Sequence, residues 1–75
     1  MTQTDMVLNH LRKYSSITPR EADDLYGIMR LGARIYDLKR QGYVIKSVNI
    51  KSTNRFGDPV RFARYFLEEE RSVSP

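Results

Sequence analysis

Apolar residues recur every three or four positions in the first forty residues and then alternate with polar ones. Near the start of the chain, Val7, Leu8, Leu11 and Tyr14 follow helical spacing. Thr4 precedes them, and its hydroxyl can accept a hydrogen bond from a free backbone N–H of the first turn. The pattern therefore predicts a first amphipathic helix that begins near Thr4.

A second helix is predicted from a strong start signal. Thr18 is suited to the N-cap, Pro19 to the first helical position, and Glu21 to a capping box with Thr18. Ala22 and Leu25 are then expected to point into the core.

This second helix is expected to stop at Gly27, which readily adopts the left-handed conformation that follows a helix. A third helix is predicted over about residues 30–41, with Gly42 ending it. Its buried stripe consists of Leu31, Ile35 and Leu38, at spacings of four and three. Two helices joined by a short turn with glycine are typical of the helix-turn-helix unit, whose second helix enters the DNA major groove.

The period changes to two after the third helix. Residues 43–50 are rich in β-formers, 52–59 are turn-rich, and 60–67 read as a return strand. Ile17 is expected to add a short bridge beside this hairpin, and residues 68–75 are expected to form a frayed polar tail. Within the return strand one face holds Ala63, Tyr65 and Leu67, and the other holds Val60, Phe62, Arg64 and Phe66. This order predicts an α+β winged helix-turn-helix, with three helices followed by a two-stranded β-hairpin wing.

Composition excludes several classes of protein and site. A chain of 75 residues is one domain (residues 1–75, core about 4–67), and it has no cysteine and a single histidine, His10, expected to be partly exposed. Disulfides are therefore excluded, and a zinc site lacks its ligands, so we expect no metal and no cofactor. There is no Gly-rich phosphate loop, no Gly-x-Ser-x-Gly elbow and no Cys/His pair, and we expect no enzyme activity. No apolar run is long enough for a bilayer, and the start lacks a signal-peptide pattern, so a soluble, cytoplasmic protein is expected.

Charge is concentrated in the second half of the domain. The net charge is +4, but residues 29–64 hold nine Lys and Arg against two Asp. Basic charge gathered in one region is the electrostatic mark of a polyanion partner, although a solvated surface would give the same composition.

The third helix supplies the first group of candidate contacts. On the face opposite its apolar stripe, Arg30 is suited to a guanine edge and Ala33 to a thymine methyl. Tyr36 could reach a phosphate or stack on a sugar. Lys39 and Arg40 lie in the last turn, where the helix dipole favours cations, and Arg40 is expected to meet the phosphate backbone.

Arg34 has two interpretations. It is a candidate for DNA contact, but Asp37 lies three residues later, and an ion pair between them would make Arg34 structural. Asp37 would repel phosphate, so pairing with an arginine is its expected state.

The predicted wing, residues 51–61, supplies the second group of candidates: Lys51, Asn54, Arg55 and Arg61. A flexible basic hairpin tip suits phosphates or a neighbouring minor groove, whereas cations on an edge also prevent strand-to-strand aggregation. Phe56 at the loop, with Phe62 and Phe66 on the outer strand face, could mark an interface between two copies or pack against the first helix.

Several motifs resemble one family. The hexad Ala-Arg-Ile-Tyr-Asp-Leu at residues 33–38 is the most specific, and residues 17–22, 27–32 and 54–65 also resemble the small winged helix-turn-helix proteins of bacteriophages and prophages. The resemblance covers about residues 4–67 and implies DNA binding in phage gene regulation or recombination control. Relatives tend to have Thr or Ser just before the second helix of the unit, where this chain has Met29.

The sequence therefore predicts sequence-specific binding of double-stranded DNA, with helix 30–41 in the major groove. A homodimer or a cooperative array on DNA is expected, because specific sites are often read by two copies one helical turn apart. The alternative is a phage-encoded inhibitor that uses the same basic surface to block a host protein that handles nucleic acid.

Overall fold

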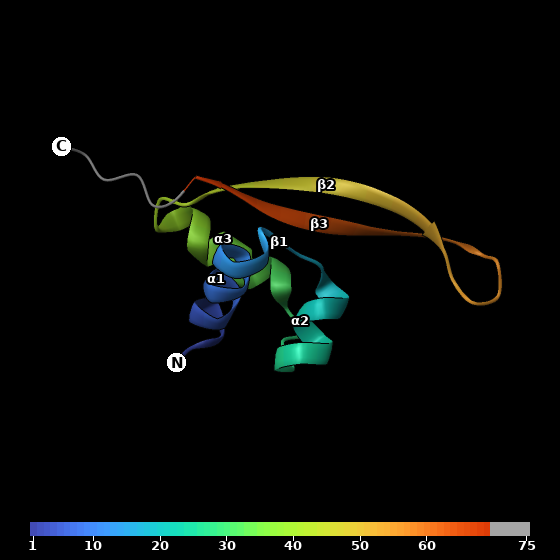
Figure 1. Cartoon of the computed structure of the whole chain (residues 1–75), viewed down its shortest axis with the longest axis horizontal. Helices are drawn as coiled ribbons and strands as arrows, with labels where there is room; N and C mark the ends of the chain where they lie inside the picture. Colours follow the sequence, from blue (N-terminus) through green and yellow to red (C-terminus); the bar gives the residue numbers. More distant parts are fainter. Residues whose placement is uncertain (70–75) are drawn as a thin grey trace.

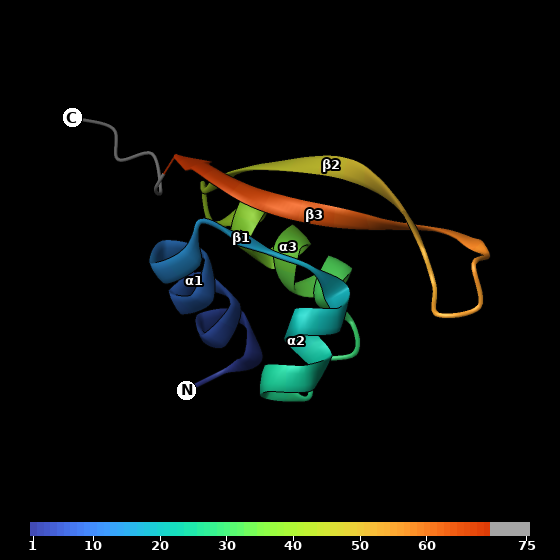
Figure 2. The ribbon, with the colours of Figure 1, turned by 45° about the vertical axis from the view of Figure 1, so that its right-hand side comes forward.

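Three helices lie on one side of a three-stranded antiparallel sheet, and the two long strands run on past them as a hairpin (Figures 1 and 2). The computed structural model describes residues 1–69. Its elements, in chain order, are α1 (Gln3–Tyr14), β1 (Ser16–Ile17), α2 (Pro19–Tyr26), α3 (Leu31–Arg40), β2 (Val44–Thr53) and β3 (Pro59–Glu69). The predicted α+β winged helix-turn-helix architecture is confirmed.

The first helix begins two residues earlier than expected. Thr2 is its N-cap, its Oγ1 accepts from the Asp5 N–H at 3.1 Å, and the Thr2 N–H donates to Asp5 Oδ2 at 3.2 Å. The prediction that Thr4 caps the helix is wrong. Thr2 has an acidic residue three positions later to close a capping box, whereas the residue three positions after Thr4 is Val7.

The local signals for α2 are confirmed. The Thr18 N–H donates to Glu21 Oε1 at 2.9 Å, and the Glu21 N–H donates to Thr18 Oγ1 at 3.2 Å. Gly27 ends the helix with φ +67°, and the Ile28 N–H closes the turn on the Ala22 carbonyl at 3.1 Å. The turn between α2 and α3 is thus fixed by hydrogen bonds within the helix-turn-helix unit.

The orientation of α2 differs from prediction at Leu25. This side chain is exposed, with 60% of its surface accessible, while Ala22 is fully buried. Tyr26 packs against the core instead. Ala22 and Tyr26 are four residues apart and face inward, and Leu25 is rotated away from them.

His10 is buried rather than partly exposed, with 4% of its surface accessible. Its Nδ1 lies 2.7 Å from the Tyr26 hydroxyl, and the two rings meet edge to face. Tyr14 is exposed, but its ring lies against His10 at a tilt of 45°, with centroids 4.6 Å apart. The polar partner on α2 allows a histidine to occupy this position between two helices.

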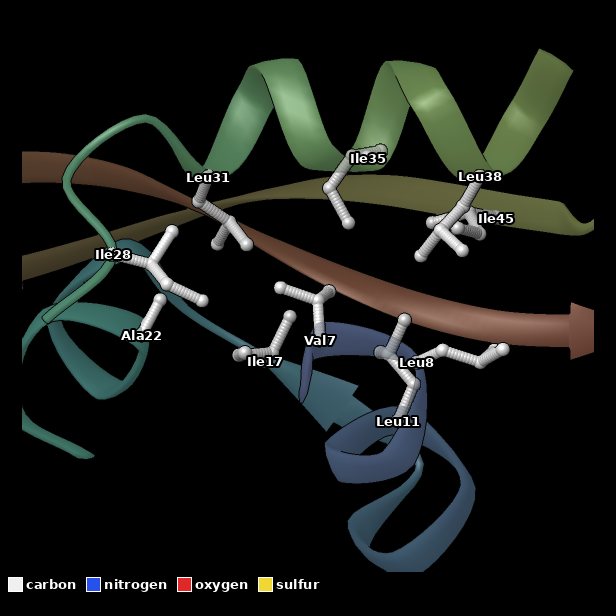
Figure 3. Packing of buried hydrophobic residues seen from close by; sticks show 10 residues of the cluster. All are labelled: Val7, Leu8, Leu11, Ile17, Ala22, Ile28, Leu31, Ile35, Leu38 and Ile45. Carbon is white, nitrogen blue, oxygen red and sulfur yellow. The ribbon is translucent and has the colours of Figure 1, made fainter. Parts of the chain in front are cut away.

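The core lies between the helices and the inner face of the sheet (Figure 3). Helix α3 contributes the predicted stripe, and the turn and β1 contribute Ile28 and Ile17. The buried apolar residues are Val7, Leu8, Leu11, Ile17, Ala22, Ile28, Leu31, Ile35, Leu38 and Ile45.

The sheet has the order β1-β3-β2. Ile17 pairs with Tyr65, which confirms the bridge predicted beside the hairpin. At the end of the hairpin opposite the wing tip, Val44 pairs with Glu69. Residues 68–69 therefore belong to β3 and not to the predicted tail. The rest of that predicted tail, residues 70–75, lies outside the described residues.

Candidate nucleic-acid interface

Helix α3 presents one apolar and one polar face. Its inner stripe is almost completely buried, with Leu38 at 0% exposure, and Tyr36 on the opposite side is 60% exposed. The helix spans Leu31–Arg40, one residue shorter at each end than predicted, with Arg30 as an N-cap that makes no side-chain capping bond. Five of the predicted contact residues of this region are exposed: Arg30, Ala33, Tyr36, Lys39 and Arg40.

Arg34 differs from these residues because an acidic partner holds it. Its Nε lies 3.2 Å from Asp37 Oδ2, which confirms the predicted pairing three residues apart. The N–H is not aligned for a hydrogen bond, so the contact is an ion pair only. Thr4 Oγ1 on α1 donates to the same oxygen at 3.3 Å. This arrangement supports the structural interpretation of Arg34.

Tyr36 and Arg40 form a second pair on the exposed face. The Arg40 guanidinium carbon lies 5.8 Å from the centroid of the Tyr36 ring, a cation–π distance one helical turn apart. Both side chains stay accessible. The contact orients a cation and a hydroxyl on the last two turns of α3.

Lys51 and Arg61 face each other across the wing. They are direct partners in the β2–β3 register, and both are exposed. Alternation along the strands places them on the same sheet face as Ile45 and Tyr65, which pack on the helical side. Two cations therefore project from one face of the hairpin, while Ser52, Val60 and Phe62 on the opposite face line a groove with the first turns of α2. The hairpin runs on past the helices (Figure 2).

The wing tip is a turn closed by hydrogen bonds to Asn54. Asn54 Oδ1 accepts from the Phe56 N–H at 2.9 Å and from the Asp58 N–H at 3.0 Å. The Gly57 N–H also donates to the Asn54 carbonyl at 3.0 Å. Asn54 thus shapes the turn, while Arg55 and Phe56 are held outward and exposed.

Arg64 has a role that the sequence did not reveal. Its Nη1 donates to Ser16 Oγ at 3.1 Å and lies 3.7 Å from Glu21 Oε1. The side chain ties β3 to β1 and to the first turn of α2. It is therefore a structural cation, unlike Lys51 and Arg61.

Residues 1–69 contain no group of three or more His, Cys, Asp or Glu side chains placed to hold a metal ion. No helix in this part of the chain is long and apolar enough to cross a membrane.

The fold and the exposed basic helix agree with a comparison of the sequence with protein families. The model of a winged helix-turn-helix domain matches residues 2–70, nearly the whole chain. The chain belongs to the winged helix-turn-helix family. No curated protein matches it. Winged helix-turn-helix domains are typically DNA-binding and non-enzymatic, so membership indicates DNA as the partner.

Proposed function

We propose that this winged helix-turn-helix protein binds double-stranded DNA sequence-specifically, with α3 in the major groove and the wing on adjacent backbone. The Lys51–Arg61 pair is the observation that carries the proposal. Like charges directly opposite each other in an antiparallel ladder destabilise the sheet. A phosphate chain along the face of the wing that carries these two cations offsets that repulsion.

The exposed face of α3 supports the same mode. Arg30 stands at the beginning of the helix, where residues of a recognition helix usually meet base edges, and Ala33 leaves room for close approach. Tyr36, Lys39 and Arg40 lie farther along and suit the phosphate backbone. The positive charge of Arg34 is partly neutralised by Asp37.

The experiment is a titration of a duplex with the protein at several salt concentrations. Affinity should fall steeply with salt, since each neutralised phosphate releases counterions. Lys51→Glu should reduce the slope of log affinity against log salt by about one or more. The same variant should raise the free energy of unfolding by about 0.2–1 kcal/mol, because it creates an opposite-charge pair with Arg61.

The chain offers a matched control for this variant. Lys46 is an exposed lysine on the same strand, but it pairs with Phe66 on the other sheet face. Lys46→Glu makes the same charge change away from the proposed interface and should weaken binding much less. If wild type binds no duplex at low salt, the proposed function is wrong.

The biological role proposed is that of a phage or prophage transcriptional regulator or recombination accessory factor. The resemblance of residues 33–38 to small phage proteins supports it. Selection of bound sequences from random duplexes tests it, because a regulator should enrich one motif. A palindrome with half-sites one helical turn apart would support the expected homodimer.

A second candidate function is binding to a host protein that handles nucleic acid. Met29 favours it, because this side chain is 85% exposed on the turn before α3, and adaptable methionine surfaces suit protein partners. Capture of one protein from nuclease-treated lysate, lost in Met29→Ala, would support this candidate. Duplex binding that Met29→Ala leaves unchanged, with no protein captured, would contradict it.

A further inference from the structure

We propose that Phe56 is a wedge that enters the DNA minor groove next to the α3 site, unstacks a base step and bends the duplex. This inference rests on the proposed function and adds to it a deformation of the DNA. The wing contacts proposed above do not require any deformation of the duplex.

Among the aromatic side chains of residues 1–69, Phe56 is the most exposed. It lies on the wing, away from the helices. It is 81% accessible at the wing tip and is not part of the hydrophobic core. A phenylalanine left in water forgoes the stabilisation of burial, which is about 1.5–3 kcal/mol for such a side chain in general. A partner surface that covers it would recover that energy.

The tip holds Phe56 in a defined position. Asn54 Oδ1 accepts the backbone N–H groups of Phe56 and Asp58, and Gly57 adopts φ +81° to complete the turn. A wedge must keep its direction while it displaces stacked bases, and these bonds prevent the tip from folding away. Asn54 is therefore a positioning residue for Phe56.

The length of the wing fits this placement. The last core-packed pair is Ser47–Tyr65, and the final pair, Thr53–Pro59, is six residues farther along, or about 20 Å. A neighbouring minor groove lies half a helical turn from the major-groove centre, or about 17 Å. The tip also bends toward the helical side of the sheet (Figures 1 and 2). A duplex seated on α3 would thus meet the tip at its next minor groove.

The charges around the ring suit the minor groove. Arg55 directly precedes Phe56, and Lys51 and Arg61 lie closer to the helices on one face of the same hairpin. Asp58 is the one acidic residue of residues 51–61. Proteins that insert apolar wedges into the minor groove commonly flank them with cations, which hold the phosphates while a base step opens.

The test uses the full chain and a duplex of about 30 base pairs that carries the sequence selected above. Fluorophores at its ends report bending by energy transfer, and 2-aminopurine at successive steps reports unstacking. Wild type should raise energy transfer and should raise 2-aminopurine emission at one step. Phe56→Ala should abolish both signals and weaken binding by roughly tenfold.

Two further variants separate the wedge from other roles of the tip. Phe56→Leu keeps an apolar wedge and should retain most of the bend. Arg55→Ala should weaken binding while the bend of the saturated complex persists. A straight duplex bound by wild type, or an equal bend with Phe56→Ala, would overturn the inference and leave the proposed function standing. Absence of any duplex binding by wild type would overturn both.

Discussion

Thr4 on α1 donates its hydroxyl proton to Asp37 Oδ2 on α3 at 3.3 Å, and this bond joins the first helix to the candidate recognition helix. The same oxygen lies 3.2 Å from Arg34 Nε. One carboxylate therefore fixes the position of α3 on the helical body and neutralises part of its positive face. Stability and DNA affinity are in opposition at this residue.

Asp37→Asn should weaken the fold and strengthen DNA binding. The free energy of unfolding should fall by about 0.5–1 kcal/mol, the usual size for a partly exposed ion pair, because Arg34 loses its ion-pair partner and Thr4 loses a charged acceptor. Affinity for duplex should rise several-fold at low salt, since an anion leaves the face and Arg34 is released. Urea denaturation and fluorescence anisotropy measure the two effects.

Asp23→Asn is the matched control for this change. Asp23 is an exposed aspartate on α2, and Asp23→Asn removes the same charge from a residue outside α3. Its affinity gain should be smaller than that of Asp37→Asn. Equal gains would mean that only net charge matters and that the network around Asp37 does not restrain Arg34.

Tyr26→Phe should destabilise the protein by about 1–3 kcal/mol. The Tyr26 hydroxyl lies 2.7 Å from His10 Nδ1, and His10 Nε2 is buried without a hydrogen-bond partner. Loss of the hydroxyl would leave both ring nitrogens unpaired in the interior. Urea denaturation measures the change, and Tyr36→Phe on the exposed face of α3 should have almost no effect. Similar losses of unfolding free energy for the two variants would show that the contact between Tyr26 and His10 does not stabilise the protein.

The fold was predictable where its signals are local. The Thr18 capping box, the Gly27 stop and the stripe of α3 each depend on residues within one or two turns. The burial of His10 and the exposure of Leu25 depend instead on how α2 is rotated against α1. That rotation is set by Tyr26 reaching the core and the imidazole, which is a tertiary effect that no periodicity within α2 reveals.

The candidate site divides in the same way. The exposed face of α3 follows from helical spacing alone, and so does the pairing of Arg34 with Asp37. The position of Lys51 opposite Arg61 requires the strand register, which the turn length sets. The hydrogen bonds of Asn54 within the turn were not predicted although their signal is local, because an asparagine that begins a turn commonly accepts backbone N–H groups two residues on.

Acid should weaken the start of α1. The pKa of Asp5 lies below its ordinary value of 3.8, because the backbone N–H and the hydroxyl of Thr2 hydrogen-bond to its ionised form. The stabilisation from this capping box is therefore complete above the ordinary value and is lost as pH falls through the lower pKa of the folded state. Asp5→Asn should be less stable than wild type near neutral pH and equal to it in strong acid. Thermal melts between about pH 6 and pH 2 test this, and two parallel curves would contradict it.

Arg30→Ala and Arg55→Ala should weaken DNA binding in different ways. Arg30 begins α3 and is proposed to read a base edge, so its loss should cost about 1–3 kcal/mol on the selected site and relax preference at one position. Arg55 lies on the wing tip and is proposed to meet phosphate, so its loss should weaken binding to all duplexes alike and reduce the salt slope by about one. Anisotropy titrations on the selected duplex, a single-position variant of it and an unrelated duplex separate the two outcomes. If Arg55→Ala changes sequence preference and Arg30→Ala does not, the major-groove role belongs to the wing, and the proposed placement of α3 is wrong.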